Sequence, residues 1–217
     1  MDSRENYRDS TFRHDALILV FLLVLSILIR FPHFFRDVIN WDESTFILLG
    51  QSVLDGHLPY TRIWDVKPPL AFLSYASFIF VFGKNIIGIR FAGSLCVTVA
   101  SLFCYLTASN FWNRRIGILA GTLSTIFISS LPDGQATMTE TVALVPLMAA
   151  LYYICANSKF DLKRIFLAGL LLAVAAAIRL NLAYVSLTIG IFLVLFSLRK
   201  NTSWHTAFRV GLAYVFG

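Results

Sequence analysis

Charged residues are scarce in this sequence. Aspartate, glutamate, lysine and arginine make up 14% of the 217 residues, whereas about 25% is usual in soluble domains. Hydrophobic residues make up 58%, and the mean hydropathy is +0.74. A soluble domain of this length has too small an interior to bury so much apolar surface. The sequence therefore predicts a protein that crosses a membrane several times, and the same numbers exclude a disordered chain.

Cysteine is almost missing as well. The three cysteines, Cys96, Cys104 and Cys155, have neither the spacing of a metal-ligating motif nor that of a disulfide framework. His33, His57 and His205 share no ligand spacing either. We therefore predict no metal site from these residues. The net charge of +6 comes from basic residues in short gaps between apolar runs, which indicates membrane orientation rather than nucleic-acid binding.

Apolar runs occupy most of the chain. The first, 16–29, follows the polar and basic residues 1–15, which we expect to form a cytoplasmic N-terminal tail. Later runs cover about 69–83, 91–109, 116–131, 141–156, 165–178, 182–198 and 206–217. We predict an all-α polytopic membrane protein with seven to eight apolar helices in a transmembrane module spanning 16–217. Because the last run reaches the final residue, we expect this module to be C-terminally incomplete, with a partner chain supplying the rest if the enzyme is split.

The gaps between runs predict the orientation of the spans. The basic gaps at 114–115, 159–164 and 199–209 are typical of the cytoplasmic side. The gaps at 132–139 and 179–181 then face outside, together with residues 31–69. Two full crossings between residues 69 and 109 would break this alternation. Either the short run 69–83 does not cross fully, or one basic gap lies outside.

Residues 31–69 form the longest stretch without an apolar run. They hold five carboxylates, and residues 44–54 are compatible with a helix that has Asp42 and Glu43 at its start. We predict a large external loop whose juxtamembrane helix lies on the outer surface. The aromatic segment RFPHFF at 30–35 is typical of an interfacial belt.

Two segments of this loop can carry chemistry. Adjacent carboxylates at a helix start, Asp42 and Glu43, can act as a base plus an orienting or metal-facing group, or can be mere surface acids. In the segment 65–70, DVKPPL, two prolines fix the chain and hold Lys67 at the interface. There Lys67 can bind a lipid phosphate or can simply snorkel beside a helix start.

Beyond Asp65, acidic residues are rare, and only Asp133, Glu140 and Asp161 follow. Glu140 directly precedes an apolar run. A carboxylate near membrane depth is costly and is usually kept for a partner or a function, but a helix-start charge with Thr139 as its N-cap fits the pattern equally well. Arg179, between two apolar runs, can anchor an anionic group or mark the interface, and we favour the interface.

Three segments in order carry a family resemblance: WDESTFILLGQSVLDGHLPY (41–60), DVKPPL (65–70) and FGKNIIGIRF (82–91). Together they resemble the N-terminal part of GT-C glycosyltransferases of the protein O-mannosyltransferase and lipid A aminoarabinose transferase-like type, over about residues 15–185. The resemblance implies a membrane enzyme, in the bacterial plasma membrane, whose active site faces outside. It would move a sugar, with inversion, from a polyprenyl-phosphate donor to a hydroxyl of a glycolipid, cell-envelope polysaccharide or protein.

The resemblance also implies roles for single residues. Asp42 corresponds to the catalytic carboxylate, and Glu140 in TMTET matches the second acidic position. In the mechanism that agrees with this resemblance, Glu43 orients the acceptor or a loop arginine. Lys67 is expected at the donor phosphate, and Arg62 and Tyr60 are expected to bind substrate beside it. No cofactor is predicted. Some family members have an acid where this chain has a valine before the lysine, so the metal role of that acid does not carry over, and a divalent metal is left open.

A non-enzymatic membrane protein is the rival interpretation: a lipid-linked-sugar flippase or transporter, or an assembly subunit. A transporter needs polar residues deep inside its spans to line a path. Here the charges gather beside the spans, which are almost free of them. This distribution favours chemistry at a membrane surface.

Overall fold

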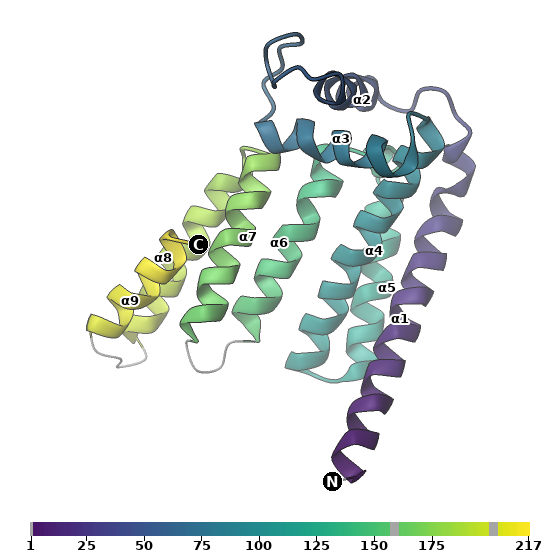
Figure 1. The fold of residues 1–217 in the computed structure, drawn as a ribbon. Coiled ribbons are helices and arrows are strands. Elements are labelled where there is room, and N and C mark those ends of the chain that lie inside the picture. The colour runs from purple at the N-terminus through teal and green to yellow at the C-terminus, as the bar shows by residue number, and fades with distance from the viewer. Residues whose placement is uncertain (1, 157–160, 200–203) are drawn as a thin grey trace.

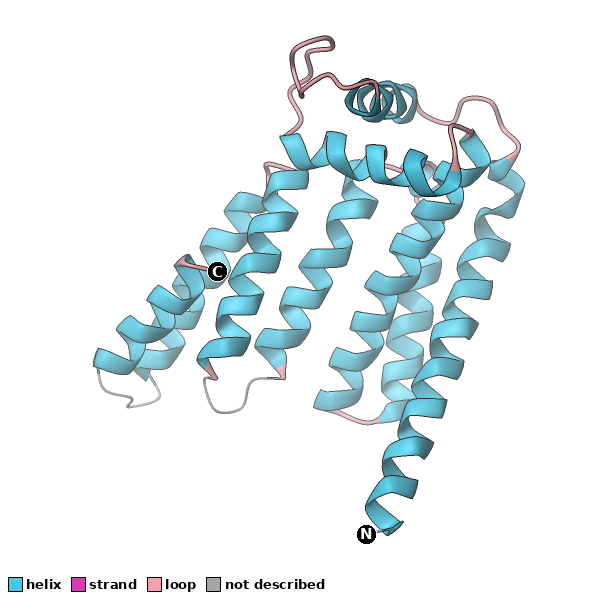
Figure 2. Cartoon of the chain, in the orientation of Figure 1, coloured by secondary structure: helices cyan, strands magenta, loops and turns pink. Residues whose placement is uncertain are grey.

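The computed structural model describes residues 2–156, 161–199 and 204–217. Within these residues the regular structure is helical, without strands (Figure 2). The elements, in chain order, are α1 (Asp2–Phe34), α2 (Trp41–Leu54), α3 (Pro69–Phe82), α4 (Ile86–Phe111), α5 (Arg114–Ser130), the 3-10 helix η1 (Pro132–Gln135), α6 (Thr139–Cys155), α7 (Leu162–Ile178), α8 (Leu182–Arg199) and α9 (Trp204–Val215).

Helix length and composition confirm a helical membrane protein. Among the described residues, three helices are long and apolar enough to cross a membrane: Arg13–Phe34 within α1, Ile86–Phe111 and Leu182–Arg199. Helices α3 and α6 are apolar but shorter. Within the described residues, these five helices do not establish the seven to eight apolar helices predicted from the sequence.

Two helices lie across one end of the bundle. Figure 1 shows α1 and α4 to α8 running side by side, while α2 and α3 cross over their ends, opposite the N-terminus. We call this end the α2–α3 end. Helix α3 has 14 residues, about 21 Å at 1.5 Å per residue, which is short of a bilayer core of about 30 Å. The run 69–83 lies across the end of the bundle and does not run alongside the other helices (Figure 1).

Helix α2 begins at Trp41, and Asp42 and Glu43 lie at its start as the sequence predicts. The side-chain oxygen of Asn40 accepts a hydrogen bond from the Asp42 N–H at 2.8 Å, which caps the helix at its N-terminus. Asp42 and Glu43 consequently lie inside the first turn, where negative charge is favourable toward the helix dipole.

An apolar cluster fixes α2 on α3. It contains Phe46 and Leu49 from α2, Phe72 and Tyr75 from α3, and Met138 from the segment before α6. The two helices approach closely at Gly50, where an added Cβ would lie 2.7 Å from the backbone nitrogen of Ala76. The α2–α3 end is therefore a packed layer.

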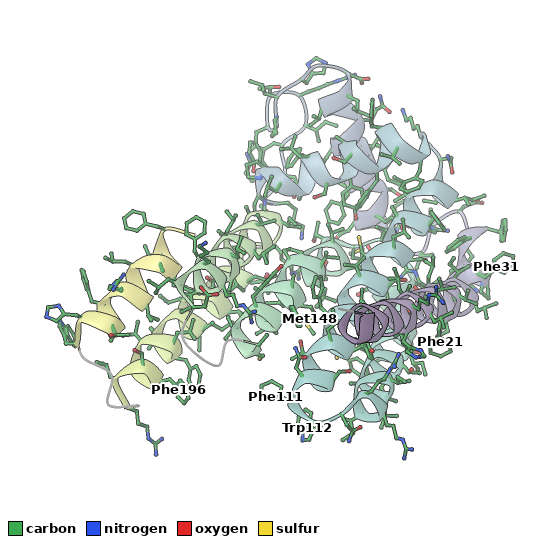
Figure 3. The ribbon with its side chains drawn as sticks, turned by 60° about the horizontal axis from the view of Figure 1, so that its bottom comes forward. Phe21, Phe31, Phe111, Trp112, Met148 and Phe196 are labelled. Carbon is green, nitrogen blue, oxygen red and sulfur yellow. The ribbon has the colours of Figure 1, made fainter. Side chains whose placement is uncertain are left out.

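Helix α1 joins this layer through a buried arginine. The sequence placed residues 30–35 in an interfacial belt, and Phe31 and Phe35 are indeed 52% and 63% exposed, with Phe31 on the outer side of the bundle (Figure 3). Arg30 differs, because it is 0% exposed. Its guanidinium donates to Ser94 Oγ at 3.1 Å and to the carbonyl oxygens of Gly134 and Ala136.

Close packing of α5 on α4 depends on two glycines. An added Cβ at Gly117 or Gly121 would collide with the side chain of Ser109 or press against that of Tyr105. Both glycines are buried. Their GxxxG spacing allows the two backbones to approach, as in membrane helix pairs.

Candidate functional site

A buried ion pair lies at the centre of the α2–α3 end. Glu43 and Arg90 are 1% and 0% exposed, and Glu43 Oε2 is 3.0 Å from Arg90 Nη2. The other carboxylate oxygen of Glu43 accepts a hydrogen bond from the Thr137 N–H at 2.6 Å. Arg90 also donates to the carbonyl oxygens of His33 and Arg36. Both oxygens of Glu43 are thus engaged, and the pair ties α2 to α4, to the end of α1 and to the segment before α6.

Asp42, directly before this pair, is exposed. Asn40 connects its turn to a second acid, since Asn40 Nδ2 donates to Asp133 Oδ1 at 2.7 Å while Asn40 Oδ1 accepts from the Asp42 N–H. The structure therefore brings Asp133 to the start of α2. The sequence placed Asp133 on the same side as Asp42 but gave it no role. One feature of the sequence could have indicated a role for Asp133: it is an acid in the gap 132–139, which holds no lysine or arginine.

The backbone of Lys67 is held on both sides. Its N–H donates to Asp65 Oδ1 at 2.9 Å, and its carbonyl oxygen accepts from the Tyr60 hydroxyl at 2.7 Å. The ammonium group lies over the Phe46 ring, 5.4 Å from its centroid, a favourable cation–π position. No carboxylate within the described residues lies at ion-pair distance from it. Lys67 is consequently a positioned cation whose charge is not neutralised.

Tyr60 and Arg62 shape the loop that leads to Lys67. Tyr60 has a left-handed backbone with φ of 71°, and its ring packs against Phe72 with centroids 5.0 Å apart. Burial and then the Asp65 carboxylate raise the pKa of the Tyr60 hydroxyl. Arg62 forms an exposed ion pair with Asp55, Nη1 to Oδ2 at 3.2 Å. Both predicted substrate-binding residues thus contact the loop itself.

Glu140, at the start of α6, has a partner at the end of the neighbouring helix α7. Its Oε1 lies 2.5 Å from Arg179 Nη1, with side chains 46% and 25% exposed. The Thr139 hydroxyl donates to Glu140 Oε2 at 3.1 Å and accepts from Arg179 at 3.3 Å. The N-cap of α6 is Met138, which makes no side-chain cap bond. Thr139 is therefore not the predicted cap, and Arg179 does more than mark the interface.

A cavity of about 510 Å³ opens between α5 and α6 beside these carboxylates. Asp133 and Glu140 line it together with mostly apolar side chains, among them Phe127, Ile128, Leu144 and Met148. Met148, on α6, is labelled in Figure 3. The site therefore combines a polar rim with a hydrophobic recess.

Most of this chain matches the model of a known protein family. A family model described as dolichyl-phosphate-mannose-protein mannosyltransferase matches residues 66–216. The chain belongs to this family. The predicted GT-C type is therefore confirmed, and this membership makes the protein a membrane glycosyltransferase in general terms. A search of curated proteins and a search of solved structures found no match.

The stretch that matches the mannosyltransferase family contains Lys67, Glu140 and Arg179, and it begins after Asp42 and Glu43. The roles of the first two acids therefore depend on the contacts described above. Within the described residues, no group of three or more histidine, cysteine, aspartate or glutamate side chains is placed to hold a metal ion. The site offers instead an exposed carboxylate, a free ammonium group and a paired glutamate and arginine at one end of the bundle.

Proposed function

We propose that this chain transfers a sugar from a polyprenyl-phosphate donor to an acceptor hydroxyl at the α2–α3 end. One observation supports this most strongly: Asn40 contacts both Asp133 and the turn that carries Asp42. Two acidic segments that are far apart in the sequence therefore form one rim. The family name, with its lipid-phosphate sugar, supports the class of donor.

In this proposal Asp42 is the general base. Its exposed carboxylate accepts the proton of the acceptor hydroxyl while the hydroxyl oxygen attacks the anomeric carbon. The bond between that carbon and the phosphate oxygen breaks, and its electron pair leaves with the polyprenyl phosphate. A single displacement of this kind inverts the anomeric configuration. Since phosphate is a good leaving group, the site needs a cation more than it needs an acid.

Lys67 is the main proposed cation for the leaving phosphate, because its charge is not neutralised within the described residues, and Arg179, which is paired with Glu140, is the second. Leu70, one turn beyond Lys67, packs against the cluster that contains Ile178, the residue before Arg179. The two cations therefore belong to the same part of the α2–α3 end. Arg62 is paired with Asp55, so we assign it, with Tyr60, to holding the loop that positions Lys67.

Glu43 and Glu140 support the site without taking the proton of the acceptor. Because Glu43 is buried and both of its oxygens are engaged, it acts as a positioning residue for the first turn of α2. Its arginine partner, Arg90, comes from α4 and not from the loop. Glu140 is the second carboxylate of the rim, and Arg179 orients it.

The orientation in the membrane is also part of the proposal. The turn between α4 and α5 and the start of α7 lie opposite the α2–α3 end (Figure 1), and they carry Arg114, Arg115, Lys163 and Arg164. The positive-inside rule assigns that end to the cytoplasm. We propose that α1 and α4 to α8 cross the plasma membrane, while α3 lies along its outer surface with the site facing outside.

Cysteine labelling tests the orientation. Single cysteines replace Trp41, Val66, Leu131 or Lys163 in a cysteine-free chain, and intact cells are treated with a membrane-impermeant maleimide. The first three side chains are 79%, 73% and 45% exposed, and they should react in intact cells. Lys163→Cys should react only after permeabilisation. Labelling of Leu131→Cys from the cytoplasmic side alone would separate Glu140 from Asp42 and refute a shared site.

A transfer assay tests the chemistry. Proteoliposomes with the full chain receive radiolabelled polyprenyl-phosphate mannose and a membrane extract as the source of acceptors. Release of polyprenyl phosphate with label on a new product supports the proposal. Movement of intact donor across the bilayer without cleavage would indicate a flippase instead.

A further inference from the structure

The cavity between α5 and α6 is charged at one end only. Asp133 and Glu140 supply the charged part of its lining, whereas Phe127, Ile128 and Met148 supply apolar wall. A free sugar would match only the rim, and a plain lipid only the wall. An amphiphile with a hydroxylated head and a long hydrocarbon tail matches both parts.

The two carboxylates of the rim differ in their partners. Glu140 is neutralised by Arg179 at 2.5 Å. Asp133 is exposed and accepts one hydrogen bond, from the neutral amide of Asn40, within the part of the chain that the structure describes. A carboxylate has about four acceptor positions. Asp133 therefore keeps acceptor capacity for hydroxyl groups that enter the cavity.

We propose that this cavity receives the glycosyl end of the lipid-linked donor and that Asp133 accepts hydrogen bonds from the hydroxyl groups of the sugar. This inference rests on the proposed function and adds to it a residue that determines donor specificity. The first prenyl units lie against Phe127, Ile128 and Met148. The charges support this direction of binding, because the carboxylate of Asp133, unpaired within the described residues, repels a phosphate, whereas the charge of Glu140 is balanced by Arg179.

The contact through Asn40 relates the bound sugar to the base. One amide side chain touches both the Asp133 carboxylate and the Asp42 N–H. A sugar held by Asp133 therefore lies beside the turn that carries Asp42. Asp133 selects the donor, and Asp42 acts on the acceptor that attacks it.

Binding to two probes tests the proposal. The full chain in lipid nanodiscs is titrated with polyprenyl phosphate and with polyprenyl-phosphate mannose. We expect the wild type to bind the glycosylated lipid about tenfold more tightly, since one or two hydrogen bonds to a charged acceptor supply a factor of this size. Asp133→Ala should lose this preference and bind polyprenyl phosphate as the wild type does. Met148→Trp, which fills the cavity, should weaken the binding of both probes.

Two further variants serve as controls. Asp37→Ala removes another exposed acid of the same end and should keep the preference. Asn40→Ala removes the amide partner and leaves the carboxylate, so it should also keep most of the preference. Loss of preference in Asn40→Ala equal to that in Asp133→Ala would place the effect at the start of α2 and overturn direct contact with the sugar.

The remaining outcomes separate the inference from the proposed function. A wild type that binds both probes equally, or an Asp133→Ala variant that keeps the preference, overturns the inference alone. A wild type that binds neither probe overturns the proposed function as well. Melting temperatures of all variants in the same nanodiscs identify any loss that comes from misfolding.

Discussion

Glu43 and Arg90 form an ion pair that is closed off from solvent, with 3.0 Å between Oε2 and Nη2. The arginine comes from the first turns of α4, and its remaining donors go to carbonyl oxygens at the end of α1. A charge pair in such a place is costly to desolvate and gives little net stability against an apolar pair, but breaking it leaves an uncompensated buried charge. Its effect is to fix where the first turn of α2 lies.

Removing one partner of this pair should therefore be more harmful than removing both. Glu43→Gln should lower the free energy of unfolding by about 3–5 kcal/mol, because Arg90 then keeps an unpaired charge. Arg90→Met should lower the free energy of unfolding to a similar extent, because Glu43 then keeps an unpaired charge. The measurement is thermal unfolding of the purified chain in detergent. The double variant Glu43→Gln/Arg90→Met should be less destabilised than either single variant, and simple additivity would contradict the pairing.

Loss of the proposed base should affect rate and leave stability unchanged. Asp42→Asn keeps the shape of an exposed side chain, so we expect an unaltered melting temperature. Sugar transfer should fall by about 100-fold to 10,000-fold, the usual contribution of general acid–base catalysis. Asp37→Asn is the matched control and should transfer sugar at the wild-type rate. Transfer by Asp42→Asn at that rate would remove Asp42 from the chemistry.

Changes at Lys67 should appear in donor binding. Lys67→Ala removes the proposed phosphate contact, so the KM for polyprenyl-phosphate mannose should rise about tenfold or more. Lys67→Arg keeps the charge and should lose less. Tyr60→Phe removes the hydrogen bond to the Lys67 carbonyl oxygen and should give a smaller rise in KM. Initial rates over a series of donor concentrations measure each value, and an unchanged KM in Lys67→Ala would assign the lysine to the interface alone.

The contact of α2 with α3 should be sensitive to a single methyl group. Gly50→Ala places a Cβ 2.7 Å from backbone atoms of Tyr75 and Ala76, and these atoms cannot move aside as a flexible side chain would. We expect a loss of about 1–3 kcal/mol from overpacking, seen as a lower melting temperature. Leu48→Ala, on the 55% exposed outer side of the same helix, is the control and should change stability little.

Much of the architecture followed from the sequence because it depends on local patterns. The scarcity of charge predicted membrane helices, and the carboxylates at 42–43 predicted a helix start. The path of the run 69–83 did not follow, since a short apolar helix fits equally well across the bilayer and along it. Its direction is fixed by packing of Phe72 and Tyr75 beneath α2, which is a contact between distant segments.

The site was predicted in its residue types and less well in its contacts. Glu140, Lys67 and Asp42 stood out because charge is rare around them. Their partners did not stand out, because tertiary structure decides which side chains pair. Nothing in the sequence indicated that Arg179 pairs with Glu140 or that Asn40 contacts Asp133. The prediction that Arg30 lies at the membrane interface was wrong for a related reason. An arginine beside aromatic residues is typical of the interface, and the contacts that bury it, with Ser94 and the carbonyl groups of 134–136, come from distant segments.

The buried position of Arg30 has a consequence for biogenesis. Its partners, Ser94 and the carbonyl groups of Gly134 and Ala136, are synthesised long after α1 has left the ribosome. Until they arrive, the guanidinium must remain hydrated, and its place near the C-terminal end of α1 lets it reach the membrane surface. The first span should therefore enter the bilayer without a fixed rotation about its axis. It takes its final orientation only when α4 and the segment before α6 are in place, so the packing of α1 is a late step of assembly.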